Sequence, residues 1–139
     1  MTWNPRQLPS QAGKTFVVTG GNAGIGYFIS EQLAAAGGRV VIACRSAAKA
    51  DAAIAAIHQR TPAAELEYVG LDLSSYESVR AAAASLEGRR IDAIIENAGA
   101  IMPSNHREVT ADGNELMFGS TVSVLTISML SMSTASCPL

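Results

Sequence analysis

The chain has 139 residues, of which 48% are apolar and 16% are charged, and its formal net charge is −2. This length and composition predict one globular domain with a modest core and exclude a disordered protein. The weak negative charge leaves no basic surface for nucleic acid, so we exclude that class of partner as well.

The chain opens with a polar leader, a strand and a helix. Residues 1–13 contain two prolines and lack the apolar core of a signal peptide, so we expect an exposed leader. Residues 14–19 (KTFVVT) form a short apolar run that is typical of a buried strand. After a glycine-rich turn, residues 25–36 predict an amphipathic helix. Its apolar side chains recur at helical spacing: Ile25, Phe28, Ile29 and Leu33.

A second strand and a second helix are predicted next. Residues 40–44 (VVIAC) form another apolar run rich in β-branched residues. Ser46 is suited to cap the alanine-rich helix that follows over residues 47–60. In that helix we expect Ile54 and Ile57 to face inward.

The same alternation continues to the end of the recognisable pattern. The remaining predicted elements are a strand, a helix, a strand and the start of another helix, at residues 66–71, 76–87, 91–95 and 111–118. Either Ser74 or Ser75 could cap the helix that begins at residue 76.

Apolar strands that alternate with helices predict a parallel sheet that is covered on both faces. Because crossover connections are right-handed, the expected fold class is α/β, a Rossmann-type doubly wound parallel sheet, truncated after about four strands. In such sheets ligands bind outside the carboxyl ends of the strands, where the strand order reverses. Candidate binding residues should therefore follow the strands in the sequence.

The glycine-rich turn after the first strand is the strongest single motif, and residues 19–26 read TGGNAGIG. Glycines let the backbone approach a pyrophosphate closely, and the start of the following helix provides N–H groups and a positive dipole end. A tight loop without a ligand is the alternative. The residues that we predict to hold a phosphate are Gly20, Asn22, Gly24, Ile25 and Gly26.

Arg45 follows the second strand, where dinucleotide folds usually place an acidic residue for the ribose 2′-hydroxyl. An arginine at this position suits a 2′-phosphate, because a guanidinium can donate two hydrogen bonds to it, and Ser46 can donate another. This pattern predicts NADP as the cofactor. A solvated surface arginine is the alternative.

Two further pairs of strand-end residues suit the rest of a dinucleotide. Asp72 and Leu73 follow the third strand, where the carboxylate could accept a hydrogen bond from an adenine amino group or could cap the next helix. Asn97, Ala98 and Gly99 follow the fourth strand, and small residues there would let a ribose lie against the backbone.

These markers, in this order, resemble the short-chain dehydrogenase/reductase family. The glycine motif matches the family's Thr-Gly-x-x-x-Gly-x-Gly turn, and residues 96–99 (ENAG) are similar to its Asn-Asn-Ala-Gly, with Glu96 in place of the first Asn. Residues 43–46 (ACRS) and 110–119 (TADGNELMFG) look like the retinol-dehydrogenase-like branch. The resemblance covers about residues 12–119. It implies an oxidoreductase that passes a hydride between NADP(H) and a carbonyl or alcohol.

The family's chemistry depends on a tyrosine followed four residues later by a lysine. None of the three tyrosines of this sequence has a lysine at that spacing. We therefore assign no catalytic residue, and we expect the chain to be inactive alone.

The last residues depart from the family pattern. The family continues with Val-Asn-x-Leu-Gly after the glycine at position 119, whereas this chain has Thr121 at the Asn position and no charged residue over 120–139. A shift of one base in a plausible coding sequence would restore the family's residues. We therefore expect a dinucleotide-binding domain over residues 1–119 and a disordered or frameshifted tail over 120–139, with a genuine divergent tail as the alternative.

The sequence thus predicts the NADP(H)-binding part of a short-chain dehydrogenase. The alternatives are a non-catalytic nucleotide-binding sensor or scaffold, and one half of a split enzyme whose other polypeptide supplies the tyrosine and lysine. No apolar run is long enough to span a membrane, and no His/Cys pattern suits a metal ion. Because the two cysteines, Cys44 and Cys137, lie far apart, we expect a reduced, cytoplasmic protein.

Overall fold

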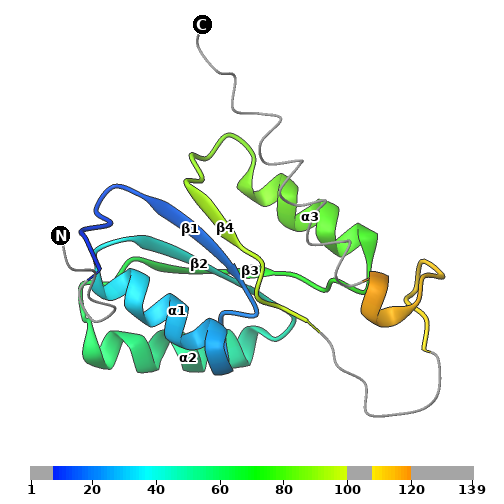
Figure 1. The fold of residues 1–139 in the computed structure, drawn as a ribbon, viewed down its shortest axis with the longest axis horizontal. Helices are drawn as coiled ribbons and strands as arrows, with labels where there is room; N and C mark the ends of the chain where they lie inside the picture. The colour runs from blue at the N-terminus through cyan, green and yellow to red at the C-terminus, as the bar shows by residue number, and fades with distance from the viewer. Residues whose placement is uncertain (1–7, 100–107, 120–139) are drawn as a thin grey trace, which may run out of the picture.

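The computed structural model describes residues 8–99 and 108–119, and in this part the chain forms a parallel sheet flanked by helices (Figure 1). The strands are β1 (Thr15–Thr19), β2 (Arg39–Cys44), β3 (Leu66–Gly70) and β4 (Ala93–Ile95). The helices are α1 (Gly24–Ala35), α2 (Ala47–Arg60) and α3 (Tyr76–Leu86). The predicted tail at 120–139 lies outside the described residues.

The strand order is β3-β2-β1-β4, and every pairing is parallel, so the expected Rossmann-type sheet is confirmed. The chain first builds outward from β1 through β2 to β3. It then returns and places β4 on the other side of β1. The order reverses between β1 and β4, so the carboxyl ends of these two strands flank the crevice in which such sheets bind ligands.

Each face of the sheet has its own apolar core, because successive side chains of a buried strand point to opposite faces. Val17 of β1 packs on the side of α3 with Val79, whereas its neighbour Val18 packs on the side of α1 and α2. Figure 1 shows the same arrangement, with α1 and α2 on one face and α3 on the other. In α2, Ile57 is fully buried and Ile54 packs against the same core, as predicted.

Serine hydroxyls cap the two helices for which the sequence predicts a serine cap. Ser46 Oγ accepts a hydrogen bond from the Lys49 N–H at 3.3 Å at the start of α2. At α3 the cap is Ser75 rather than Ser74, and its hydroxyl accepts from the Ser78 N–H at 3.4 Å. The start of each helix, and so the path of the loop before it, is fixed in this way.

The buried face of α1 coincides only in part with the apolar residues at helical spacing. Ile25 and Phe28 are 75% and 59% exposed, whereas the small residues Gly26, Ser30 and Ala34 are buried. Small side chains let a helix approach the strands closely, and the larger residues beside them then point outward. Of the four apolar residues at helical spacing, Ile29 and Leu33 do pack against the core on this face, so the apolar spacing was a correct guide for these two and not for Ile25 and Phe28.

The last predicted helix begins later than the sequence suggests. Residues 111–114 form turns, and only residues 116–119 are helical. Gly113, with a φ of +82°, donates its N–H to the Thr110 carbonyl at 2.9 Å. A tight glycine turn thus replaces the first turn of the expected helix.

Candidate functional site

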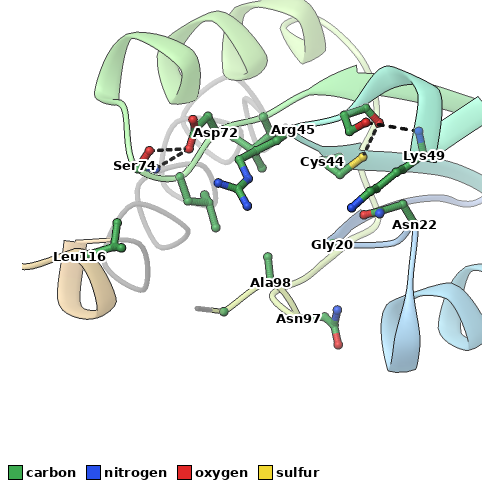
Figure 2. Close-up of a pocket in the computed structure, with 15 residues that line it drawn as sticks. Gly20, Asn22, Cys44, Arg45, Lys49, Asp72, Ser74, Asn97, Ala98 and Leu116 are labelled. Atoms are coloured by element: carbon green, nitrogen blue, oxygen red, sulfur yellow. Dashed lines mark hydrogen bonds between the residues drawn. The ribbon is translucent and has the colours of Figure 1, made fainter. Parts of the chain in front are cut away.

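A cavity of about 440 Å³ opens at the carboxyl ends of the strands (Figure 2). Its walls are the loops that follow the four described strands, together with the end of β2, one residue of α2 and one residue of the segment 108–119. Most of the residues that the sequence predicts for a dinucleotide site line this cavity: Gly20, Asn22, Arg45, Ser46, Asp72, Leu73, Asn97, Ala98 and Gly99. The fold therefore gathers markers from four separate loops at one place.

The other three predicted residues, Gly24, Ile25 and Gly26, form the first turn of α1 and do not line the cavity. Among the residues that the structure describes, no side chain caps this helix, and its first turn contains no acidic residue. The first N–H groups of a helix have no partner within the helix and carry the positive end of its dipole. This end of α1 is thus suited to an anion.

Thr19, the last residue of β1, joins the glycine turn to the loop after β4. Its side chain is fully buried, and its Oγ1 accepts hydrogen bonds from the Asn97 and Ala98 N–H groups, both at 3.0 Å. The same hydroxyl donates to the Ile95 carbonyl at 3.3 Å, and Asn97 Nδ2 donates to the Thr19 carbonyl at 3.1 Å. These bonds hold together the two loops that meet where the strand order reverses.

Two glycines allow the same two loops to pack in direct contact with α1. Gly20 has a φ of +66°, which L side chains rarely adopt, and a Cβ there would lie 3.3 Å from the Ala98 Cα. A Cβ on Gly26 would lie only 2.5 Å from Asn97 Nδ2 and 2.9 Å from the Gly20 carbonyl carbon. The glycine turn, the start of α1 and the loop after β4 therefore form one closely packed unit.

The variant Thr19→Val should lower the free energy of unfolding by about 1–3 kcal/mol, because the part-buried Ala98 N–H loses its acceptor and the Asn97 N–H keeps only the Ile95 carbonyl, while the shape is kept. Denaturation in urea measures this loss. Thr15→Val, at the other end of β1, is the matched control and should change stability by less than about 0.5 kcal/mol. Equal losses in the two variants would contradict the role given to Thr19.

Two cationic side chains face the cavity beyond β2. Arg45 is exposed, and within the described residues its guanidinium forms no salt bridge. Lys49 lies in the first turn of α2, and Figure 2 shows its side chain extending toward Asn22 of the glycine turn. Lys49 was missed at the level of sequence, although it follows Arg45 by four residues, about one helical turn. Together with the Ser46 hydroxyl, which can still donate its proton, these groups suit a phosphate.

Asp72 organises the loop after β3. Its Oδ1 accepts hydrogen bonds from the Ser74 N–H at 2.9 Å and from the Ser74 hydroxyl at 2.6 Å. Burial alone would raise the pKa of the Asp72 carboxyl, but these bonds and the charge of Arg45 outweigh it and lower the pKa below its ordinary value. The alternative role as the cap of the next helix belongs to Ser75 instead. The carboxylate is thus held ionised at the cavity wall.

Several other lining residues also escaped the sequence patterns: Ala43, Cys44, Leu71, Ser74 and Leu116. Cys44 is buried, and burial raises the pKa of its thiol, so the thiol stays protonated at neutral pH. The apolar members of this set give part of the cavity a surface that suits a flat ring rather than a charged group.

Other kinds of site find no support in the described ranges. Over residues 8–99 and 108–119, no three His, Cys, Asp or Glu side chains gather closely enough to hold a metal ion. In the same ranges, none of the helices is long and apolar enough to cross a membrane. The cavity at the strand ends is therefore the candidate site.

Comparison with known proteins identifies the sequences and folds that this chain is similar to. A family model described as short chain dehydrogenase matches residues 14–139, a range that includes the positions 120–139. Human retinol dehydrogenase 13 is 41% identical over 116 residues, which cover 80% of this chain and 34% of that protein.

Solved structures agree with the family match. The crystal structure of an uncharacterized protein from Mycobacterium Paratuberculosis has a TM-score of 0.80 and 34% identity, covering 96% of this chain and 47% of that one. The NADP active-site complex of Pseudomonas aeruginosa RhlG has a TM-score of 0.69 and 31% identity, covering 90% of this chain and 49% of that one. The chain spans about a third of the length of the curated relatives it matches.

Proposed function

The chain belongs to the short chain dehydrogenase family, and we propose that the cavity at its strand ends is the NADP(H) site of an oxidoreductase acting on a carbonyl or alcohol. The observation that carries this proposal is the meeting of two features in one cavity. The glycine turn at the start of α1 offers a place for a diphosphate, and the cations after β2 offer a place for a further phosphate.

The parts of a dinucleotide can be assigned to the walls by their chemistry. The diphosphate would lie against Gly20 and Asn22, near the uncapped first turn of α1. The adenine would lie beside Asp72 and Leu73, and a ribose would lie over residues 97–99. When bound, the nicotinamide ring of the cofactor supplies or accepts the hydride. The residues described here bind and orient the nucleotide and take no part in that transfer.

A preference for NADP(H) over NAD(H) rests on the charges after β2. Arg45 and Lys49 both face the cavity, and Ser46 stands between them in sequence. No acidic residue follows β2 directly to accept a hydrogen bond from a ribose 2′-hydroxyl. The similarity to RhlG, whose structure holds NADP and which is 31% identical, supports the same preference.

We further propose that this chain binds the cofactor without turning over a substrate. Its sequence contains no tyrosine with a lysine four residues later. In the family such a pair exchanges the proton with the substrate oxygen, since the lysine lowers the pKa of the phenol. Among the described residues that line the cavity there is no tyrosine, and Asp72 is the one carboxylate.

Titration of the purified chain with NADPH and with NADH, followed by calorimetry, tests the proposal. We expect NADPH to bind about 10- to 150-fold more tightly than NADH, because one or two charge-assisted hydrogen bonds to the 2′-phosphate are worth about 1.5–3 kcal/mol in total. No oxidation of NADPH should follow when simple aldehydes and ketones are added. Equal affinities would contradict the preference, turnover would contradict the inactivity, and a folded chain that binds neither nucleotide would overturn the site.

A further inference from the structure

The segment 108–119 forms a small folded unit of its own beside the cavity. Its strand-like ends pair at Val109 and Glu115, and the Thr110 N–H donates to the Asn114 carbonyl at 2.7 Å. The Thr110 hydroxyl is buried and accepts from the Asn114 N–H at 3.1 Å. The segment is therefore held in one shape by its own backbone and side-chain bonds.

This unit is attached to the start of α3 by two hydrogen bonds. Asp112 Oδ2 accepts from the N–H of Tyr76, the first residue of α3, at 2.8 Å. Asn114 Nδ2 donates to the Tyr76 hydroxyl at 3.1 Å. A carboxylate at this position also interacts favourably with the positive end of the helix dipole. The segment is thus fixed to the helix that directly follows the loop carrying Asp72.

Leu116 is the residue of the segment that reaches the cavity. It lines the cavity and is half-buried, whereas the next two residues, Met117 and Phe118, are 42% and 67% exposed and do not line it. Figure 2 shows Leu116 on the side of Ser74, away from the end where Lys49 and Asn22 lie. The apolar side chain thus lies at the end opposite Lys49 and Asn22.

We propose that Leu116 contacts the adenine base of the bound nucleotide. Asp112 is the residue that positions Leu116, because its hydrogen bond to Tyr76 attaches the segment 108–119 to α3. This inference rests on the proposed nucleotide site and adds a wall to it. The loop carrying Asp72 and Leu73 forms one side of the base pocket, and Leu116 forms another. The bond from Tyr76 to Asp112 fixes the distance between these two sides.

The first test is the affinity of the whole chain for adenosine 2′,5′-bisphosphate, measured by calorimetry. Leu116→Ala should weaken binding about five- to tenfold, because apolar surface on the base stays exposed to water. The ratio should be the same at low and high ionic strength, since the lost contact carries no charge. Phe118→Ala, which removes an exposed neighbour outside the cavity, is the matched control and should bind as the unmodified chain does.

The second test separates positioning from general stability. Asp112→Ala should weaken binding about as much as Leu116→Ala, whereas Asp112→Asn, which keeps an acceptor for the Tyr76 N–H, should restore most of the affinity. The double variant Asp112→Ala/Leu116→Ala should bind no more weakly than Leu116→Ala alone, because both changes remove one contact. Strictly additive losses would overturn the positioning role.

The failure of this inference can be told apart from the failure of the proposed site. If the unmodified chain binds the bisphosphate and Leu116→Ala binds equally well, the inference is overturned and the site stands. If the folded, unmodified chain binds neither the bisphosphate nor NADPH, both are overturned. Thermal melts of every variant establish that the compared proteins are folded.

Discussion

Gly26→Ala should abolish measurable nucleotide binding and lower the free energy of unfolding by about 1–3 kcal/mol. The added Cβ would lie 2.5 Å from Asn97 Nδ2 and 2.9 Å from the Gly20 carbonyl carbon, which is closer than such atoms approach. One of these neighbours must therefore move, and both belong to residues that line the cavity. A loss of stability would be diagnostic of this close contact, because replacing a glycine within a helix by alanine normally raises the free energy of unfolding by about 1 kcal/mol.

A matched control for this variant is Gly70→Ala. Gly70 ends β3, has no positive φ and does not line the cavity, and among the described residues a Cβ there would meet the far end of the Tyr68 side chain, at 3.3 Å. Calorimetry with NADPH and urea denaturation should show little change for this control. If Gly26→Ala and Gly70→Ala had the same NADPH affinity and the same free energy of unfolding, close packing at the glycine turn would not be needed for the site.

The arrangement of strands and helices could be predicted because each β–α unit shows its own signal. The alternation of apolar runs with helical segments, and the serine at position 46, depend on local preferences that tertiary packing leaves unchanged. The glycine turn was recognisable for the same reason, since Gly20 adopts a positive φ that glycine favours.

The orientation of α1 could be read only in part from its apolar residues, because Ile29 and Leu33 pack against the core whereas Ile25 and Phe28 are exposed. Its buried side is formed by small residues and by Glu31, which is 7% exposed and pairs with Arg60 of α2 at 2.6 Å. A buried carboxylate is tolerated only with such a partner, and that partner lies on another helix. Periodicity treats each helix alone, so it grouped the exposed Phe28 with Ile29 and Leu33, which do contact the core.

Parts of the site were missed because they depend on how separate segments meet. Leu116 lines the cavity from a segment that Asp112 and Asn114 attach to Tyr76 of α3, through contacts between residues 36 and 38 positions apart. The local signal in that segment was the Asp112-Gly113 pair, which is typical of a turn and argues against a helix beginning at 111. Lys49 was missed because a lysine in the first turn of a helix usually lies in solvent.

Arg45→Ala should weaken NADPH binding by about 10- to 150-fold and change NADH binding less than about twofold. The guanidinium lines the cavity at the end of β2, and only NADPH presents a phosphate for it to bind. Lys49→Ala should act in the same direction but less strongly, because an ammonium makes no paired hydrogen bonds to a phosphate. Titration of each variant with both nucleotides at one ionic strength measures the selectivity.

Control variants must show that Arg45→Ala weakens NADPH binding through the 2′-phosphate and not through the loss of a positive charge anywhere on the protein. Arg80→Ala removes an exposed arginine on α3, outside the cavity, and should leave both affinities unchanged. Arg45→Asp should go further and favour NADH, since a carboxylate accepts a hydrogen bond from the ribose 2′-hydroxyl and repels the phosphate. Raising the salt concentration should lower the ratio of NADPH affinity to NADH affinity in the unmodified chain, because the exposed charges are screened. An equal loss of NADH and NADPH affinity in Arg45→Ala would instead place this arginine at the diphosphate, which both cofactors share.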